Sequence, residues 1–513
     1  MKKIVILDLS KDIDLLVKDS EVFQLSSGIT KLERCKIVRK KFYSEKNFQI
    51  FTKEINNLFI NFYKNLKVGK SNQSYLCLEI FNQRNDKTQI YNKIYYLNQV
   101  LKYIKFRDFQ KIEIVTDDST FLNSYKSIKS KRIKIIDIST KTEFTYRKYF
   151  SKTLFFHIKA LLVVSLAKLI NKQKFQNKKK LEGCLSIFPL FYKENKHKFY
   201  NNNFLNFNFQ LTDETHLGNS LFKNLKTIFN INKINNTLSV ESFVRIRNIL
   251  FNFFQSLEGY KLIRKTNLYN FEINTINYSD QFRSLFFNSL LNLNKLNIYQ
   301  SAFDQIFDRY TIKKFHLYLF EYNFGYFLSH MIKKKSPKTI LIGYQHGIYS
   351  ERLMWQNFSK KINLSNYYPD LIICKYFFSF DAYKNNFKNI PIKLLDKKKV
   401  IKELKKETIK VSQYNVYLGL HDCYNIINEL RNLGNVIKFK LILHPKMKYK
   451  NILNIGKNFK FNFNSLKKNQ ATLVSSTSTM PYQLYSKEKY NIVAPKNIIP
   501  LNPKSLDHKI LKI

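Results

Sequence analysis

The chain has 513 residues, 44% of them hydrophobic, and a formal net charge of +51 from 88 Lys+Arg against 37 Asp+Glu. This length exceeds what one hydrophobic core usually supports, and the hydrophobic content excludes a disordered chain, so we expect a globular protein of at least two domains. The charge favours anionic partners. However, the basic residues are scattered and form no zinc finger, aromatic RNA-binding motif or basic arm, so we expect no nucleic-acid partner.

The cysteines and the N-terminus both indicate a cytoplasmic protein. Five cysteines, an odd number without a CxxC pair, argue against a disulfide framework and against a cysteine zinc site. The first apolar run, residues 4–7, ends at Asp8 and is too short for the core of a signal peptide. It predicts a first β-strand instead.

The first 150 residues or so alternate apolar runs with polar stretches of helical character, which is typical of an α/β unit. The third run is followed by Asp117 and Asp118. A carboxylate in such a loop can act as a general base, and it can equally cap the next helix. The strand-like runs cover residues 4–7, 75–80, 112–115 and 133–138.

Residues 153–170 form an apolar stretch that predicts a helix. Lys159, Lys168 and His157 interrupt it, so we do not expect it to cross a bilayer. Basic residues crowd both flanks, which is typical of an interfacial helix on the anionic inner leaflet of the cytoplasmic membrane. A buried core helix followed by a basic loop explains the pattern equally well.

The middle of the chain is expected to be mainly helical. Residues 171–180 read as an exposed linker and residues 185–192 as a strand. From about 212 to 335, Phe, Leu and Ile recur at helical spacing, with Ser239 as a candidate N-cap of a long helix. Glu321 stands at the start of a helix, where its charge would favour the helix dipole.

A tight loop is predicted after a buried strand at residues 339–343. Gly343 and Gly347 bracket Gln345 and His346 there, so the backbone can turn closely and expose the imidazole, although His346 could also simply hydrogen-bond an interdomain loop. A strand at 370–375 follows, and then a charged stretch at 396–410. We place the domain boundary there, giving domains 1–395 and 396–513.

Three strand-like runs in the second domain end in polar residues. They span residues 416–422, 438–447 and 471–485, and parallel strands with helical crossovers would bring their carboxyl ends to one rim, where ligands bind. A hydroxyl-rich turn opening a helix suits a phosphate oxygen, so the pattern predicts a nucleotide-activated substrate. Helix capping and strand termination are the simpler alternative. The polar endings are His421, the pair His444 and Pro445, and the cluster Ser475, Ser476 and Thr477.

The order of these motifs resembles bacterial surface-carbohydrate biosynthesis proteins of the GT-B type, which include capsule and lipopolysaccharide glycosyltransferases. The motifs are Gly-Tyr-Gln-His-Gly, Pro-Asp, His-Pro and Ser-Ser-Thr, and they fall within residues 320–485. The chain is also similar to bacterial sialyltransferases, through His444-Pro445 and Ser475-Ser476. Teichoic-acid polymerases share the His346-Gly347 and His444-Pro445 pairs. Ser119 stands where the sialyltransferase carboxylate motif has glycine.

The resemblance implies an α/β, GT-B-like fold with two Rossmann-like domains facing each other across a cleft, and a helix-rich insertion in the first domain. It implies a metal-independent glycosyltransferase without a cofactor, using a nucleotide-sugar donor and a glycan or lipid-linked acceptor. His346 is the first choice for the base, with Asp118 and Glu321 as alternatives. A sugar-nucleotide epimerase of the same architecture and a non-catalytic assembly or nucleic-acid-binding protein remain open. The expected substrate-binding residues are Gln345, Gly347, His421, His444, Pro445, Ser475, Ser476 and Thr477.

Overall fold

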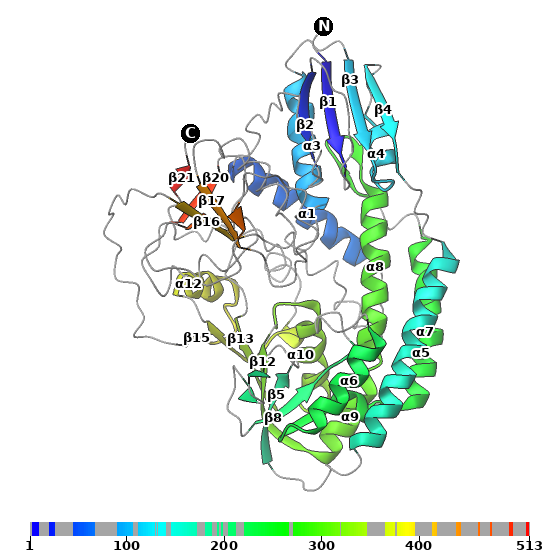
Figure 1. The fold of residues 1–513 in the computed structure, drawn as a ribbon, viewed down its shortest axis with the longest axis vertical. Helices are drawn as coiled ribbons and strands as arrows, with labels where there is room; N and C mark the ends of the chain where they lie inside the picture. The colour runs from blue at the N-terminus through cyan, green and yellow to red at the C-terminus, as the bar shows by residue number, and fades with distance from the viewer. Residues whose placement is uncertain are drawn as a thin grey trace.

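Three parallel β-sheets with helices packed around them make up the described part of the chain, a computed structural model (Figure 1). The predicted α/β class is confirmed. The structure describes residues 3–9, 20–25, 45–66, 90–105, 111–128, 130, 132–139, 145–171, 180–186, 192–193, 196–197, 204–211, 220–265, 270–318, 320–345, 365–374, 377–395 and six short strands between 413 and 511.

The first sheet has four parallel strands in the order β2-β1-β3-β4. The chain leaves β1 for β2 on one side and returns to the other side of β1 with β3, so the topological switch point lies between β1 and β3. Three of the four strand-like runs of this region are confirmed, and the run at 75–80 lies outside the described residues. The strands are β1 (Lys3–Asp8), β2 (Ser20–Gln24), β3 (Lys111–Thr116) and β4 (Ile133–Asp137).

Aromatic side chains join this first sheet to the helical layer. Helix α1 packs its Phe59 edge-on against Phe282 of α8, with the ring centroids 5.2 Å apart, and Phe62 against Phe286 in the same way at 5.3 Å. Such pairs add to the apolar area that both helices bury. The helices of this unit are α1 (Glu45–Asn65), α3 (Ile90–Lys105) and α4 (Leu122–Lys126).

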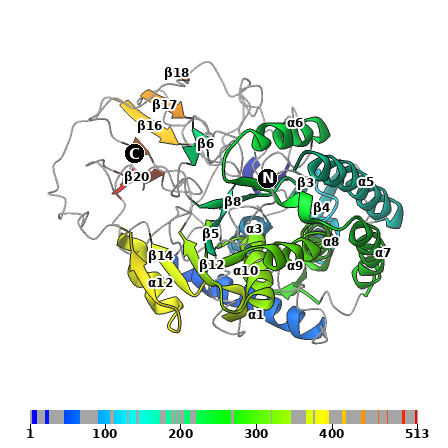
Figure 2. The same cartoon turned by 90° about the horizontal axis from the view of Figure 1, so that it is seen from below.

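A layer of helices, α5 to α10, comes next, and the two views place α5 and α7 at its outer edge (Figures 1 and 2). Ser239 does not cap a long helix: its hydroxyl bonds Glu241, a four-residue 3-10 helix (Val240–Phe243) follows, and α7 starts only after Arg245. A short hairpin, β10 (Glu272–Ile273) and β11 (Ile276–Asn277), precedes α8. The helices are α5 (Tyr146–Asn171), α6 (Leu221–Asn232), α7 (Ile246–Ile263), α8 (Ser279–Asn297), α9 (Gln300–Arg309) and α10 (Asn323–Lys335).

The second sheet has seven parallel strands in the order β15-β14-β13-β12-β5-β8-β9. Read from β9 to β15, with the strands numbered in chain order from β5, this is the Rossmann order 3-2-1-4-5-6 followed by one more strand. The switch point therefore lies between β5 and β12. The strands are β5 (Lys180–Ser186), β8 (Leu205–Asn208), β9 (Thr237–Ser239), β12 (Thr311–Tyr318), β13 (Ile340–Tyr344), β14 (Leu371–Cys374) and β15 (Ile392–Leu394).

Two parts of this sheet differ from the sequence prediction. Strand β5 starts at Lys180, earlier than the expected run at 185–192, and Tyr192–Lys193 pairs with Lys196–His197 in a separate small hairpin. Strand β12 lies in the region expected to be helical. The last four residues of β12 are all buried. Such a short buried run shows no alternation of apolar and polar residues, so its hydrophobic periodicity cannot distinguish a strand from a helix.

Gly343 lies within β13 and not in a turn. A Cβ atom at this position would lie 2.4 Å from Pro369 Cγ and 2.9 Å from Phe320 Cδ1. The glycine is therefore required for close packing against the segment that enters β14. Nearby are a 3-10 turn at Ser365–Tyr367 and helix α12 (Phe377–Asn386).

The third sheet has six parallel strands in the order β18-β17-β16-β19-β20-β21, again the order 3-2-1-4-5-6 along the chain. Its switch point lies between β16 and β19. Each of the three strand-like runs predicted in this region overlaps a strand, the first only at residues 416–417, and the expected boundary at 396 falls between β15 and β16. The strands are β16 (Gln413–Tyr417), β17 (Lys438–Ile442), β18 (Lys460–Phe461), β19 (Thr472–Leu473), β20 (Ile492–Pro495) and β21 (Lys509–Leu511).

Candidate functional site

The structure places three of the predicted site residues, and all three follow the carboxyl end of a parallel strand. Asp118 follows β3, Glu321 follows β12 and Gln345 follows β13. Parallel sheets bind ligands at this end, above all at the switch point. His346, Gly347, His421, His444, Pro445, Ser475, Ser476 and Thr477 lie outside the described residues.

The three described site residues are divided between two sheets. Asp118 belongs to the four-stranded sheet, whereas Glu321 and Gln345 belong to neighbouring strands of the seven-stranded sheet. In the third sheet, the strands β16 and β19 that flank the switch point are followed in the sequence by His421 and by Ser475. Each sheet therefore has at least one predicted residue next in sequence to a switch-point strand.

Asp118 is one of two carboxylates that hold Lys93. The Lys93 Nζ atom of α3 lies 2.8 Å from Asp118 Oδ2 and 2.8 Å from Oδ1 of Asp8, the fully buried last residue of β1. The hydroxyls of Thr116 and Tyr125 donate to the other oxygen of Asp8, at 3.0 and 2.7 Å. The result is a closed polar cluster at the β1/β3 switch point.

The charges of this cluster stabilise one another. Burial alone would raise the pKa of Asp118, but Lys93 and the two hydrogen bonds from Thr120 outweigh it and hold the pKa below its usual range. Burial opposes the charge of Lys93 too, yet Asp8 and Asp118 keep the Lys93 pKa well above its usual range. A carboxylate so strongly paired is a weak proton acceptor, so these contacts suit Asp118 to positioning Lys93 rather than to acting as a base.

Sequence reasoning missed Asp8 and Lys93. Asp8 ends an apolar run as abruptly as Asp117 ends the run of β3, and this was the available signal. Lys93 lies on a helix between the two strands in sequence and carries no local sign of its role. Its Nζ atom also lies 4.9 Å from the centroid of the Phe121 ring, which adds a cation–π contact.

Glu321 is almost fully buried beside the switch point of the seven-stranded sheet. The hydroxyl of Tyr383, on α12, donates a hydrogen bond to its Oε1. Burial, and after it the charge of Glu321, raises the pKa of both Tyr318 and Cys374 well above their usual values. Glu321 thus lies buried beside the side chains of Tyr318, Cys374 and Tyr383.

Gln345 lies on the neighbouring strand end. Its backbone N–H donates to Ile373 O of β14 at 3.0 Å, and its side chain is buried. The backbone is thereby fixed at the residue immediately before His346. Glu321 and Gln345 are therefore the two predicted residues that the structure brings to adjacent strands of one edge.

A second buried carboxylate, Glu241, follows β9 in the same sheet and has a structural role. It accepts hydrogen bonds from the Gln210 N–H and the Ser239 hydroxyl, both at 2.6 Å, and from the Tyr299 hydroxyl. Burial raises its pKa, and these hydrogen bonds act in the opposite direction. The network ties β8, β9 and α8–α9 together at full burial, so it leaves no face for a ligand.

Among the described residues, no group of three or more His, Cys, Asp or Glu side chains is placed to hold a metal ion. No protein-family model matches the chain, and a search of curated proteins found no match.

Proposed function

We propose that the protein is a glycosyltransferase of the GT-B type that moves a sugar from a nucleotide-activated donor to a surface polysaccharide or lipopolysaccharide acceptor. The observation that carries the proposal is the succession of two parallel sheets, within residues 180–395 and 413–511, that share the strand order 3-2-1-4-5-6. Two such units in tandem are what a GT-B enzyme requires. In this reading the four-stranded sheet is an additional N-terminal unit.

The donor nucleotide is assigned to the second of these units. Nucleotides bind in the crevice at the switch point of such a sheet, with phosphates at a helix N-terminus. The strands β16 and β19 flank this point, and the sequence continues from them to His421 and to Ser475, Ser476 and Thr477. His444 and Pro445 follow β17, the neighbour of β16. This coincidence of motif and strand order supports the assignment.

The base is assigned to the first of the two tandem units, within residues 180–395. The burial of Glu321 makes it a candidate for the base alongside His346. In the reaction, the acceptor hydroxyl oxygen attacks the anomeric carbon and its proton passes to the base, while the bond from that carbon to the nucleotide phosphate breaks with its electron pair on the phosphate oxygen. A buried carboxylate at the β12 end suits the proton transfer. Asp118, held by Lys93, suits it less.

The test starts with donor binding. Thermal unfolding with CMP-, CDP-, UDP- and GDP-sugars should show one nucleotide that raises the melting temperature, since a ligand that binds the native state stabilises it. Ser476→Ala and His444→Ala should reduce that shift. If no nucleotide sugar shifts the melting temperature, the proposal is wrong.

Turnover then identifies the base. His346→Ala and Glu321→Gln are compared with Asp118→Asn and with Glu258→Gln, which changes an exposed carboxylate on α7 and serves as the control. We expect one of the first two to lose turnover by about 100-fold or more with donor binding intact. Conversion of the nucleotide sugar without acceptor would indicate the epimerase instead, and salt-sensitive oligonucleotide binding without turnover would indicate a nucleic-acid-binding protein.

A further inference from the structure

Helix α5 buries one face and exposes an apolar stripe on the other. Ala160, Val163, Val164 and Ala167 are fully buried, so the core interpretation holds for that side. The opposite side carries large apolar residues at spacings of three, four and seven, and between Phe155 and Leu169 this stripe runs about 21 Å at 1.5 Å per residue. The stripe consists of Phe155 (68% exposed), Ile158 (50%), Leu162 (51%) and Leu169 (65%).

Helix α7 continues this surface. It runs antiparallel to α5, as shown by the hydrogen bonds from Tyr149 to the Ser256 carbonyl and between His157 and Asn252, at 2.9 and 2.8 Å. Four of its exposed residues are large and apolar as well, and both views show the two helices together at the edge of the molecule (Figures 1 and 2). These residues are Ile246, Leu250, Phe251 and Phe254.

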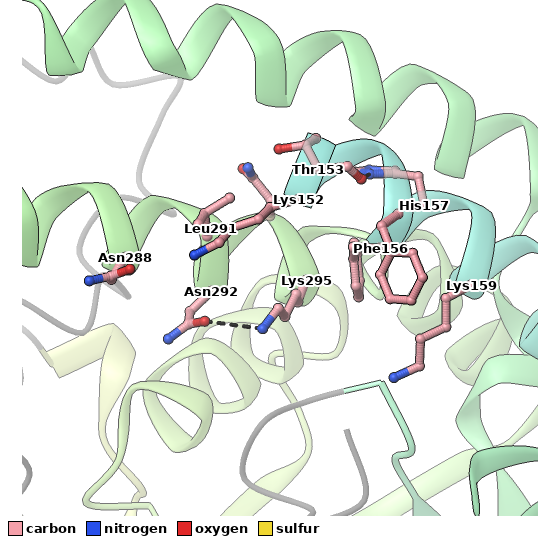
Figure 3. Close-up of a pocket in the computed structure, with 11 residues that line it drawn as sticks. Lys152, Thr153, Phe156, His157, Lys159, Asn288, Leu291, Asn292 and Lys295 are labelled. Carbon is pink, nitrogen blue, oxygen red and sulfur yellow. Dashed lines mark hydrogen bonds between the residues drawn. The ribbon is translucent and has the colours of Figure 1, made fainter. Parts of the chain in front are cut away.

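A cavity of about 430 Å³ opens beside the stripe, between α5 and α8 (Figure 3). Three lysines line it, Lys152 and Lys159 from α5 and Lys295 from α8, together with the amide of Asn292. No carboxylate occurs among the described residues of its wall. Phe155 belongs both to this wall and to the stripe, so the cationic cavity and the apolar surface are continuous.

Burial and neighbouring cations disfavour the charged state of Lys152. Burial, followed by the charges of Lys148 and Lys295, lowers the pKa of Lys152. An anion between these side chains would remove that repulsion. On α5, α6 and α7 taken together the sequence has a single acidic residue, Glu258, so cations dominate around the whole surface.

We propose that the cavity between α5 and α8 binds the phosphate group of an anionic lipid, while the stripe of α5 and the exposed apolar residues of α7 lie in the interfacial layer of the bilayer. The cavity supplies the cations that a phosphate needs, and the adjoining stripe supplies an apolar surface that only an amphiphile can use. Although α5 is the one described helix that is long and apolar enough to span a membrane, its buried face packs on α6, α7 and α8, which fits a helix lying on the bilayer. The proposal stands independently of the transferase activity.

The experiment is co-sedimentation of the full chain with vesicles of phosphatidylcholine alone or mixed with phosphatidylglycerol in equal parts. We expect binding to the mixed vesicles only, with release at high salt, because exposed charges are screened. Lys152→Gln/Lys295→Gln should weaken binding about 25-fold, from about fivefold for each lysine near an anionic surface. Lys53→Gln/Lys64→Gln, which removes the same charge from exposed positions on α1, is the matched control and should bind nearly as well as the original chain.

A second variant tests the stripe. Phe155→Gln/Leu162→Gln changes two exposed side chains to a good helix former, so the fold is retained, and we expect vesicle binding to fall about tenfold or more. Far-UV circular dichroism and the melting temperature serve as folding controls for both double variants. Donor-induced thermal shifts should be unchanged in both, which separates this proposal from the proposed function.

Five outcomes would overturn the proposal. The first three are the absence of vesicle binding, equal binding to phosphatidylcholine alone, and a Lys152→Gln/Lys295→Gln variant that binds no worse than the α1 control. The fourth is thermal stabilisation by glycerol phosphate or inorganic phosphate that requires Lys152 and Lys295 without any vesicle binding, which would identify a site for a soluble phosphate. Self-association that Phe155→Gln/Leu162→Gln abolishes, again without vesicle binding, would make the stripe an interface between copies of this chain.

Discussion

Lys93→Met should destabilise the four-stranded sheet by about 3–5 kcal/mol at neutral pH, the usual cost of removing one partner from a buried ion pair. Lys93 Nζ lies 2.8 Å from Oδ1 of Asp8, which is fully buried, and the substitution leaves that oxygen without its cation. Asp118 contributes less to the loss, because its side chain is 27% exposed and water can replace the lysine. Met preserves the length and apolar stem of the side chain, so the effect reports charge rather than volume.

Hydrogen exchange of β1 and β3 is the suitable assay, because it measures the opening of this sheet alone. Protection of their amides should fall by roughly 100-fold or more. Asp8→Asn/Lys93→Met is the control, since it leaves no fully buried charge without its partner, only the partly exposed Asp118, and should restore most of the protection. Unchanged protection in Lys93→Met, or a double variant as unprotected as the single one, would refute this reasoning.

Three further predictions concern other described sites. Gly343→Ala should lower stability by about 1–3 kcal/mol, because its Cβ would lie 2.4 Å from a proline carbon, whereas Gly259→Ala, with its nearest contact at 3.6 Å, should not; thermal unfolding compares the two. The pKa of Asp118 is lowered in the folded protein, so its charge stabilises the fold above the usual Asp range, and this stabilisation is lost as the pH falls through the folded-state pKa. Asp118→Asn should therefore flatten the acid limb of a curve of unfolding free energy against pH. Tyr383→Phe removes the donor to Glu321 and should cost about 1–3 kcal/mol in thermal unfolding, and a variant as stable as the original chain would contradict the contact.

The strands that sequence reasoning found are those with a strong local signal. The runs at 4–7, 112–115 and 339–343 combine β-branched residues with an abrupt polar end, and each matches a strand to within one residue at either end. Strand β12 was missed because its neighbours in sequence are helical and its buried half has no period. Strand order was beyond local reasoning altogether, since β5 pairs with β12 across a long intervening chain.

The same limit applies to the candidate site. Asp118 was found because it follows an apolar run, and Glu321 because it is an acidic residue at the start of a predicted helix, but their partners are distant in the sequence. Lys93 meets Asp118 across 25 positions, and Tyr383 meets Glu321 across 62. Such pairs depend on the fold, and a single sequence gives no means to identify them.

The pairing of β5 with β12 also bears on how the chain is made. Ser186 ends β5 long before Thr311 begins its neighbour, so on the ribosome one edge of β5 waits for its partner. At about 5–20 residues per second the wait is on the order of ten seconds. During that time β8 and β9 can cover the opposite edge, while the open one presents unpaired amides and carbonyls to any extended chain nearby. Slow or interrupted synthesis between these strands would therefore expose the nascent protein to aggregation in a way that the finished fold does not.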